Sequence, residues 1–246
     1  MTPSLKNLLI AGLLTFVAGI VLLFPARVAY HWFIPEGVQL GGIEGSIWTG
    51  SARDVTGGGV YLRDVRWRMR PLLLFTGKLG FGVEATPGSG LIEADIALGL
   101  GGNVTLTNLT GSASLNAFAD VLKMPGLAGN VSLQFERIQF IDGLPVDVVG
   151  TVAVAGLVAP LIDSSSIGDY RMEFFTTENG VVASVEDSNG AFDLAGGLTI
   201  SEDRNYVFLG KIAATDRTSG KLRQQLRFLG TPDERGQHEI RLEGSL

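Results

Sequence analysis

Apolar and polar side chains alternate in run after run between residue 42 and the C-terminus, and this pattern constrains the fold more than any other feature of the sequence. The run 65–70 alternates three apolar residues with three arginines, and the same period of two returns in 92–98, 131–136 and 237–243. A period of two sends successive side chains to opposite faces of a β-strand. Strands with one buried and one solvated face are typical of antiparallel sheets. We therefore expect a mainly β protein built on an antiparallel sheet.

Helical signals in this part of the sequence are short. Residues 71–76, 116–123 and 219–229 predict two or three short helices, the last because its leucines recur at helical spacing. The apolar run 144–160 is interrupted by Asp147 and by glycines, and Val146, Val148, Val152 and Val154 within it share one parity. It is therefore interpreted as a buried strand and not as a second membrane span.

The N-terminus carries the longest uncharged apolar run. No charged side chain occurs in residues 8–24, and extending the segment back to Leu5 gives the roughly 20 residues that a helix needs to cross the hydrocarbon core. Pro25 favours the end of the helix at that point. A cleaved signal peptide would have a shorter apolar run, and its candidate cleavage site after Ala29 has Arg27 close by. We therefore predict a retained membrane anchor with its short N-terminal tail in the cytoplasm.

Composition excludes several classes of function. The chain has 246 residues, of which 46% are hydrophobic and 18% charged, so it can bury a sizeable core as one large domain or two small ones. Its formal net charge of -6 disfavours general nucleic-acid binding, which depends on clustered lysine and arginine. It has no cysteine, which excludes thiolate catalysis, zinc–thiolate sites and disulfides.

Glycine is unusually frequent, with 34 residues, about twice its ordinary share. Many of these glycines lie between two apolar residues of the same parity, so we expect them on the buried face of their strands. Two interpretations stay open: the glycines bend the sheet and leave room for large rings, or they are ordinary turn and strand-start glycines. On the first interpretation, a concave apolar surface is formed by Trp48, Gly45, Gly111, Gly129, Gly150 and Gly196.

Arginine side chains form the one distinctive charge pattern of the sequence. Arg66, Arg68 and Arg70 share one face of a predicted strand, and Arg63 is nearby. Cations on one strand face repel one another, so we expect something to compensate them. Either acidic side chains of a neighbouring strand do so, or the four arginines contact a partner protein or lipid headgroups.

Candidate catalytic and metal-binding groups are scarce. The two histidines, His31 and His238, are far apart in the sequence, and neither has acidic ligands at metal spacing. No nucleophile, zinc-hydrolase or nucleotide-binding motif is present. The stretch 163–169 combines serines with two carboxylates and is interpreted as a solvated turn. We therefore expect no enzyme, no catalytic or metal-binding residues and no cofactor.

Three segments carry a resemblance to a known family: FPARVAYHW (24–32), GIEGSIWTGSA (42–52) and VRWRMRPLLLFTGKL (65–79). The chain resembles, over essentially its whole length, the N protein of the bacterial type II (general) secretion pathway. The resemblance implies an accessory protein with one N-terminal span in the inner membrane and a periplasmic β-rich domain. It implies service to a machine that exports folded proteins, and it supplies no catalytic residues.

The expected organisation is a cytoplasmic tail over 1–4, a transmembrane signal anchor over 5–25 and a periplasmic domain over 26–246, built on a curved, groove-like antiparallel sheet. The expected function is that this domain docks on other components of the secretion machine, in particular its inner-membrane ones. The alternative is a periplasmic lipid-binding β-groove, similar in architecture to proteins that handle lipid between membranes. The expected partners are thus secretion-system proteins and the inner membrane, with lipid in the alternative, and no nucleic acid.

Overall fold

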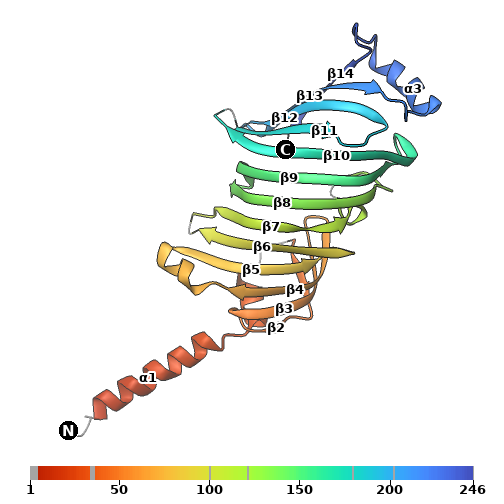
Figure 1. Cartoon of the computed structure of the whole chain (residues 1–246). Coiled ribbons are helices and arrows are strands. Elements are labelled where there is room, and N and C mark those ends of the chain that lie inside the picture. Colours follow the sequence, from red (N-terminus) through yellow and green to blue (C-terminus); the bar gives the residue numbers. More distant parts are fainter. Residues whose placement is uncertain are drawn as a thin grey trace.

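The computed structural model describes residues 5–33, 37–99, 101–120, 122–178, 180–201 and 203–245. Within these ranges, one antiparallel sheet of 14 strands makes up the body of the protein, with short helices at its margins and a long helix at its N-terminal end (Figure 1). The expectation of a mainly β chain on an antiparallel sheet is confirmed. The predicted cytoplasmic tail, residues 1–4, lies outside the described residues.

The strands follow one another in the sheet in nearly the same order as in the chain. Their bounds are β1 (Gln39–Gly41), β2 (Glu44–Gly45), β3 (Thr49–Gly57), β4 (Val60–Met69), β5 (Lys78–Thr86), β6 (Gly90–Gly99), β7 (Val104–Ser114), β8 (Ala128–Ile141), β9 (Leu144–Ala159), β10 (Asp163–Thr177), β11 (Gly180–Asp187), β12 (Phe192–Ile200), β13 (Asn205–Ala214) and β14 (His238–Ser245). The path across the sheet runs from β1 to β3 and then in sequence to β14, while β2 pairs with β3 beside this path. Because each strand pairs with its neighbour in the chain, local alternation is enough to build this meander.

The helices are short apart from the first. Their bounds are α1 (Leu5–Leu22), α2 (Ala26–Phe33), η1 (Pro71–Thr76), η2 (Leu115–Phe118), α3 (Gly220–Leu226) and η3 (Arg227–Leu229). Each of the three predicted short helices is present, as η1, as η2 and as α3 with η3. The short helices nevertheless exceed the predicted two or three, because α2 follows directly on Pro25 and η3 continues α3 as a separate turn. The apolar run 144–160 forms β9, as predicted.

One face of the sheet is apolar from strand to strand, and we call it the apolar face. A single row of directly paired residues crosses ten strands, from β5 to β14. It reads Ala85, Ile92, Gly111, Leu133, Val152, Met172, Val185, Gly196, Gly210 and Ile240. The period of two therefore keeps its register across most of the protein, and every member of this row is apolar or glycine.

The opposite face, which we call the polar face, is defined by the adjacent row of paired residues. It reads Arg66, Glu84, Glu93, Thr110, Gln134, Thr151, Glu173, Ser184, Gly197, Leu209 and Arg241. Because neighbouring residues of a strand point to opposite sides, the two rows separate apolar from mostly polar side chains from β5 to β14, with Leu209 as the apolar exception on the polar face.

Most of the buried apolar side chains gather in three clusters on this sheet, and a few lie outside them. The largest cluster lies at the margin that carries η2 and α3, where Leu115, Leu127, Leu222 and Leu226 pack with apolar residues of the neighbouring strands. A second cluster lies at the end that carries α1, and a third surrounds Val181 on the apolar face. Elsewhere most side chains of the apolar face are only half-buried or exposed.

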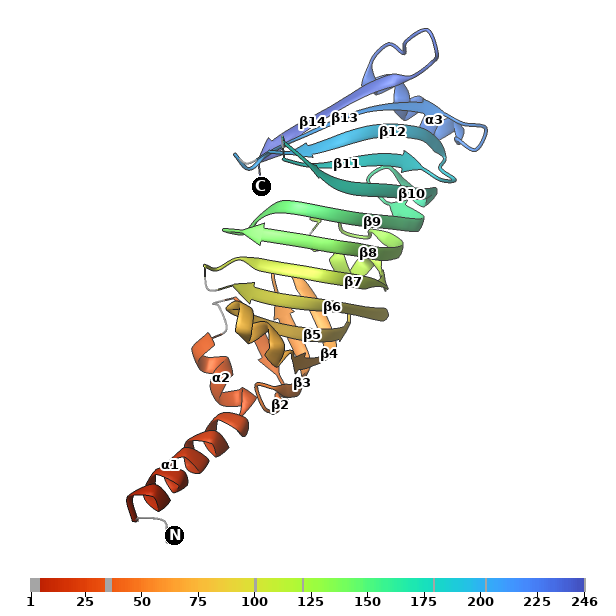
Figure 2. The ribbon, with the colours of Figure 1, turned by 60° about the vertical axis from the view of Figure 1, so that its left-hand side comes forward.

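The helix α1 points away from the sheet at the end where β1, β2 and β3 lie (Figure 2). Beyond Lys6 and Asn7 in its first turn, its side chains are almost all apolar, and Leu9, Leu13 and Phe16 are each more than 60% exposed. Among the described residues, no helix combines the length and the apolarity that crossing a membrane demands.

Candidate functional site

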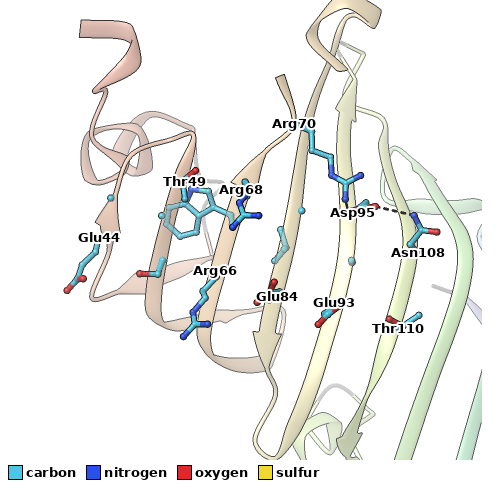
Figure 3. A pocket seen from close by; sticks show the side chains of 17 residues that line it. Glu44, Thr49, Arg66, Arg68, Arg70, Glu84, Glu93, Asp95, Asn108 and Thr110 are labelled. Atoms are coloured by element: carbon cyan, nitrogen blue, oxygen red, sulfur yellow. Dashed lines mark hydrogen bonds and ion pairs between the residues drawn. The ribbon is translucent and has the colours of Figure 1, made fainter. Parts of the chain in front are cut away.

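A large hollow of the described surface lies on the polar face, between β2 and β7. Its volume is about 990 Å³, and it is an open groove lined mainly by charged and hydroxyl side chains. Figure 3 shows arginines of β4 on one side and acidic side chains of β5 and β6 on the other. The residues that line it by their side chains include Arg66, Arg68, Arg70, Glu84, Glu93, Asp95, Asn108 and Thr110.

The four arginines singled out in the sequence do not act as one set. Arg70 forms an ion pair with Asp95, which also accepts a hydrogen bond of 3.1 Å from Nδ2 of Asn108 (Figure 3). Arg63 points elsewhere and donates from Nη2 to the carbonyl oxygen of Gly88, at 2.8 Å. A neighbouring acidic strand therefore compensates part of the positive charge, and the groove brings together only the other three arginines.

Arg66 and Arg68 are exposed on the polar face near the base of the sheet, by which we mean the end where α1 and α2 meet β1, β2 and β3. Arg66 lies directly opposite Glu84 in the β4–β5 register, and Arg68 lies opposite Gly82. In the part of the chain that the structure describes, neither guanidinium makes a hydrogen bond or an ion pair. The two unpaired arginines of β4 thus lie beside the acidic pair Glu84 and Glu93 of the next two strands, and the groove above these side chains is open to another molecule.

Trp48 lies at the junction between the sheet and α1. Its indole Nε1 donates a hydrogen bond of 2.8 Å to the carbonyl oxygen of Val21, in the last turn of α1. The backbone N–H of Ile47 donates to the carbonyl oxygen of Phe24, at 3.1 Å. Carbonyl groups in the last turn of a helix lack partners within the helix, so these bonds fix the end of α1 to the sheet.

Two of the singled-out glycines lie beneath aromatic rings on the apolar face. A Cβ at Gly196 would lie 2.7 Å from the ring of Phe208, and a Cβ at Gly150 would overlap the ring of Phe135. Gly111 lies in the apolar row, as Gly196 does, and a Cβ at Gly111 would meet the β6 backbone. The bare backbone at these positions is therefore covered by a neighbouring group and does not form an empty hollow.

The other two glycines have local backbone roles. Gly45 has φ +84 beside the tight turn that connects β2 to β3. Gly129 has φ +135 and sits where the β8–β9 register shifts between Ala128 and Asn130. Positive φ is accessible to glycine at little cost, so one position serves a turn and the other a bulge.

The interpretation of 163–169 as a solvated turn is wrong, because the segment forms the start of a strand and Asp163 within it is buried. The segment begins β10, and Asp163 is only 7% exposed. Its Oδ1 accepts hydrogen bonds from the hydroxyl and the backbone N–H of Ser165, and its Oδ2 lies 3.6 Å from Nζ of Lys221 on α3. The hydrogen bonds from Ser165, with the charge of Lys221, hold the pKa of Asp163 below its usual value. The carboxylate fixes α3 to the sheet, which is a structural role.

The histidines lie apart from each other in the fold as well. His31 is on α2, and His238 is buried at the start of β14 with no hydrogen-bond partner for Nδ1 among the described residues. Over those same residues, no group of three or more His, Cys, Asp or Glu side chains is arranged to hold a metal ion. The charged groove and the apolar face are thus the surfaces with the clearest capacity to bind another molecule.

Comparison with known proteins gives a consistent result over nearly the whole chain. The family described as "Type II secretion system (T2SS), protein N" matches residues 36–241. A protein of Aeromonas hydrophila named Type II secretion system protein N is 26% identical, over 98% of this chain and 99% of its own length. A protein of the same name from Vibrio cholerae serotype O1 is 24% identical, over 94% of each chain. No solved structure matches the chain.

Proposed function

Because the chain belongs to the type II secretion system protein N family and is therefore a component of that secretion machinery, we propose that it serves there without catalysis, as an inner-membrane protein whose periplasmic sheet docks on other components. The observation that carries the docking is the charged groove of the polar face. Arg66 and Arg68 are exposed there without a partner in the described chain, beside the acidic side chains of Glu84 and Glu93. Charged surfaces of this kind guide and select protein partners more than they stabilise a fold.

The anchor in this proposal is the segment 5–25, with 1–4 in the cytoplasm and 26–246 in the periplasm. The 18 residues of α1 rise about 27 Å, close to the thickness of a hydrocarbon core. A helix that is apolar on every side is unsuited to water and needs a lipid or protein environment. Single-cysteine variants test this topology, because the chain has no cysteine of its own. An impermeant maleimide added to spheroplasts is expected to label Ser112→Cys, and to label Ser4→Cys only after lysis; the reverse pattern would overturn the orientation.

Charge reversal in the groove tests the docking. The double variant Arg66→Glu, Arg68→Glu is expected to lower the recovery of other secretion components with the tagged chain by about tenfold, because like charges then face each other across the interface. Arg171→Glu is the control, since it reverses the charge of one exposed arginine on the polar face of β10, outside this groove. Equal recovery for both variants would end the proposal that the groove is a docking site. Arg63 and Arg70, which already have partners in the chain, are expected to contribute less.

A second candidate function is a lipid-binding groove, and the apolar face supports it. The apolar row crosses ten strands, and away from η2 and α3 part of that face stays accessible: Leu79 and Leu98 are 43% and 38% exposed. Acyl chains could lie along such a surface. Native mass spectrometry of the full chain is expected to detect bound lipid that Met172→Lys removes and the adjacent polar-face control Glu173→Lys retains. Equal lipid occupancy in the two variants would exclude the apolar face as the site.

A further inference from the structure

The last strand of the sheet has a pairing partner on one side only. All eight residues of β14 pair with β13, from His238 opposite Ile212 to Ser245 opposite Asn205. The path across the sheet ends at β14, and no hydrogen bond from another described residue reaches the outer side of its backbone. The outer N–H and C=O groups of β14 are therefore free to pair with another strand.

β14 lacks several of the features that protect edge strands. It is eight residues long, pairs in unbroken register and contains neither lysine nor proline; its protection is limited to charged side chains on the polar face, which alternate in sign and can themselves be paired by an added strand. The other edge of the sheet differs, because β1 has three residues and β2 has two. Length and register make β14 the better template for an added strand.

The apolar face is also unfinished at β14. Ile240 ends the apolar row, and Leu242 on the same face is 58% exposed although its partner across the pair, Phe208, is half-buried. A further strand would lie about 4.8 Å beyond β14 and would bring its own side chains against Leu242. The exposed leucine is thus explained if the sheet continues.

We propose that β14 accepts one β-strand from a different protein of the secretion machinery, which extends the sheet by main-chain hydrogen bonds. This inference rests on the proposed function, and it adds where and how one partner binds. The accepted strand has alternating character, with apolar side chains against Ile240 and Leu242. Its polar side chains between them carry positive, negative and positive charge opposite Glu239, Arg241 and Glu243. Main-chain pairing supplies the affinity and the alternate side chains supply the specificity.

A second copy of the chain is a poor occupant for geometric reasons. The path from β1 to β14 has 13 strands, so β14 lies about 60 Å from the end that carries α1. Two copies joined at β14 would hold their α1 helices at opposite ends of one sheet, on the order of 100 Å apart. Both helices could not then enter the same membrane. Antiparallel self-pairing satisfies the charges, with Glu239 opposite Arg241 of the other copy, so the experiment must distinguish it.

Single-cysteine cross-linking in cells that assemble the secretion machine tests the proposal. Leu242→Cys, coupled to a short maleimide–diazirine reagent, places the probe at the open edge. Leu209→Cys is the control, because it is a leucine of similar exposure, 52%, on the polar face of the adjacent strand β13, whose backbone is already paired on both sides. We expect the probe at Leu242 to attach, about tenfold more than the control, to a single extended segment of another secretion component. Attachment to a second copy, equal attachment from both positions, or none above the control would overturn the proposal.

A charge on the apolar side of the edge gives a second readout. Leu242→Lys makes strand addition unfavourable, whereas Leu209→Lys changes the same residue type on a strand that accepts no partner. With unchanged melting temperatures in both variants, recovery of the partner is expected to fall only for Leu242→Lys. If Leu242→Lys keeps the partner while the Arg66, Arg68 reversal loses it, the edge proposal fails and docking through the groove stands. If both variants keep every component, docking itself fails.

Discussion

The two ends of the sheet are finished in opposite ways. At the base, where α1 and α2 meet β1, β2 and β3, Ala52 is fully buried and Ile43 is 7% exposed. There the indoles of Trp48 and Trp67 donate hydrogen bonds to backbone carbonyl groups at 2.8 and 3.2 Å. At the far end, β14 leaves Leu242 more than half exposed. The outermost strand of an antiparallel meander always keeps free backbone groups on one side, so a further strand can pair with it unless other residues cover that edge. The packed end and the exposed end of this sheet therefore differ in whether another strand can be added. The base is built to terminate the sheet, and the far end is suited to continue it.

Truncation of one large side chain at each end gives the largest expected difference. Trp67→Ala removes a ring that covers Gly50 and packs on the base cluster, so it is expected to lower the free energy of unfolding by about 3 kcal/mol. Leu242→Ala at the far end is expected to cost less than about 0.5 kcal/mol, because the side chain is mainly solvated. Urea unfolding of the full chain in detergent, followed by circular dichroism, measures both values. Equal costs would show that the far end is packed as firmly as the base.

Substitution of a glycine that lies beneath an aromatic ring is expected to give a smaller difference between the two ends. A Cβ at Gly50 would lie 2.5 Å from the Trp67 ring and 2.6 Å from the carbonyl oxygen of Glu44, so Gly50→Ala is expected to cost about 1–3 kcal/mol. A Cβ at Gly244 would meet only the Tyr206 ring, at 2.6 Å from its hydroxyl, on an edge strand that can shift. Gly244→Ala is therefore expected to cost under about 1 kcal/mol, since the lower entropy of the unfolded chain offsets part of the strain. The same unfolding measurement applies, and a larger cost at Gly244 would contradict the comparison.

The bond between Trp48 and α1 tests how the base holds the helix. Trp48→Phe removes the N–H donor to Val21, a loss worth about 1 kcal/mol, while the ring remains. A spin label at position 20, introduced as Ile20→Cys, is expected to become more mobile relative to the sheet. Trp67→Phe is the control, because it removes the bond from Trp67 to Ser46 within the base and leaves the contact with α1 intact. Increased mobility in the control alone would show that Trp48 does not position the helix.

The smallest expected effect is a pH dependence at the far end. Backbone hydrogen bonds from Gln237 and Arg235, and then the ion pair with Lys211, lower the pKa of Asp233 from its ordinary value of 3.8. The stabilisation is therefore fully present above the unfolded-state pKa and is lost as the pH falls through the lower, folded-state pKa. Below about pH 4, amide exchange in 233–237 is expected to rise after correction for intrinsic rates, with no change in β3. Asp233→Asn is expected to remove this pH dependence. Corrected exchange rates in 233–237 that stay constant with pH in the unsubstituted chain would contradict the prediction.

Parity in the sequence was sufficient to predict the class of fold and most strands, because a meander pairs neighbours in the chain. Even the interrupted run 144–160 is a strand, and Asp147 within it pairs with Arg137 on β8 at 2.5 Å. Contacts between distant segments were not accessible in this way. Trp48 is fixed by a carbonyl group 27 residues earlier, and Asp163 is buried because α3 returns over the β9–β10 turn.

The roles of the individual glycines could not be predicted from the sequence either. Gly45 and Gly150 share the pattern of a glycine between apolar residues, yet one serves a turn and the other lies under an aromatic ring. The difference comes from the paired strand, which places Phe135 opposite Gly150. In the candidate site, the arginine stripe was visible from the sequence, but the division into paired and unpaired arginines depended on which acidic residue each one meets.

Hydrogen–deuterium exchange on the full chain in membranes, with and without the rest of the secretion machinery, tests the contrast between the two ends most directly. The far edge is expected to gain protection when the machinery is present, with amides of 238–245 slowing by about tenfold or more as their outer groups become paired. Amides of β1 and β3 at the base are expected to exchange at the same rate in both samples. Unchanged exchange in β14, or protection that appears at the base instead, would contradict a sheet that is closed at the end carrying α1 and continued by a partner at the other.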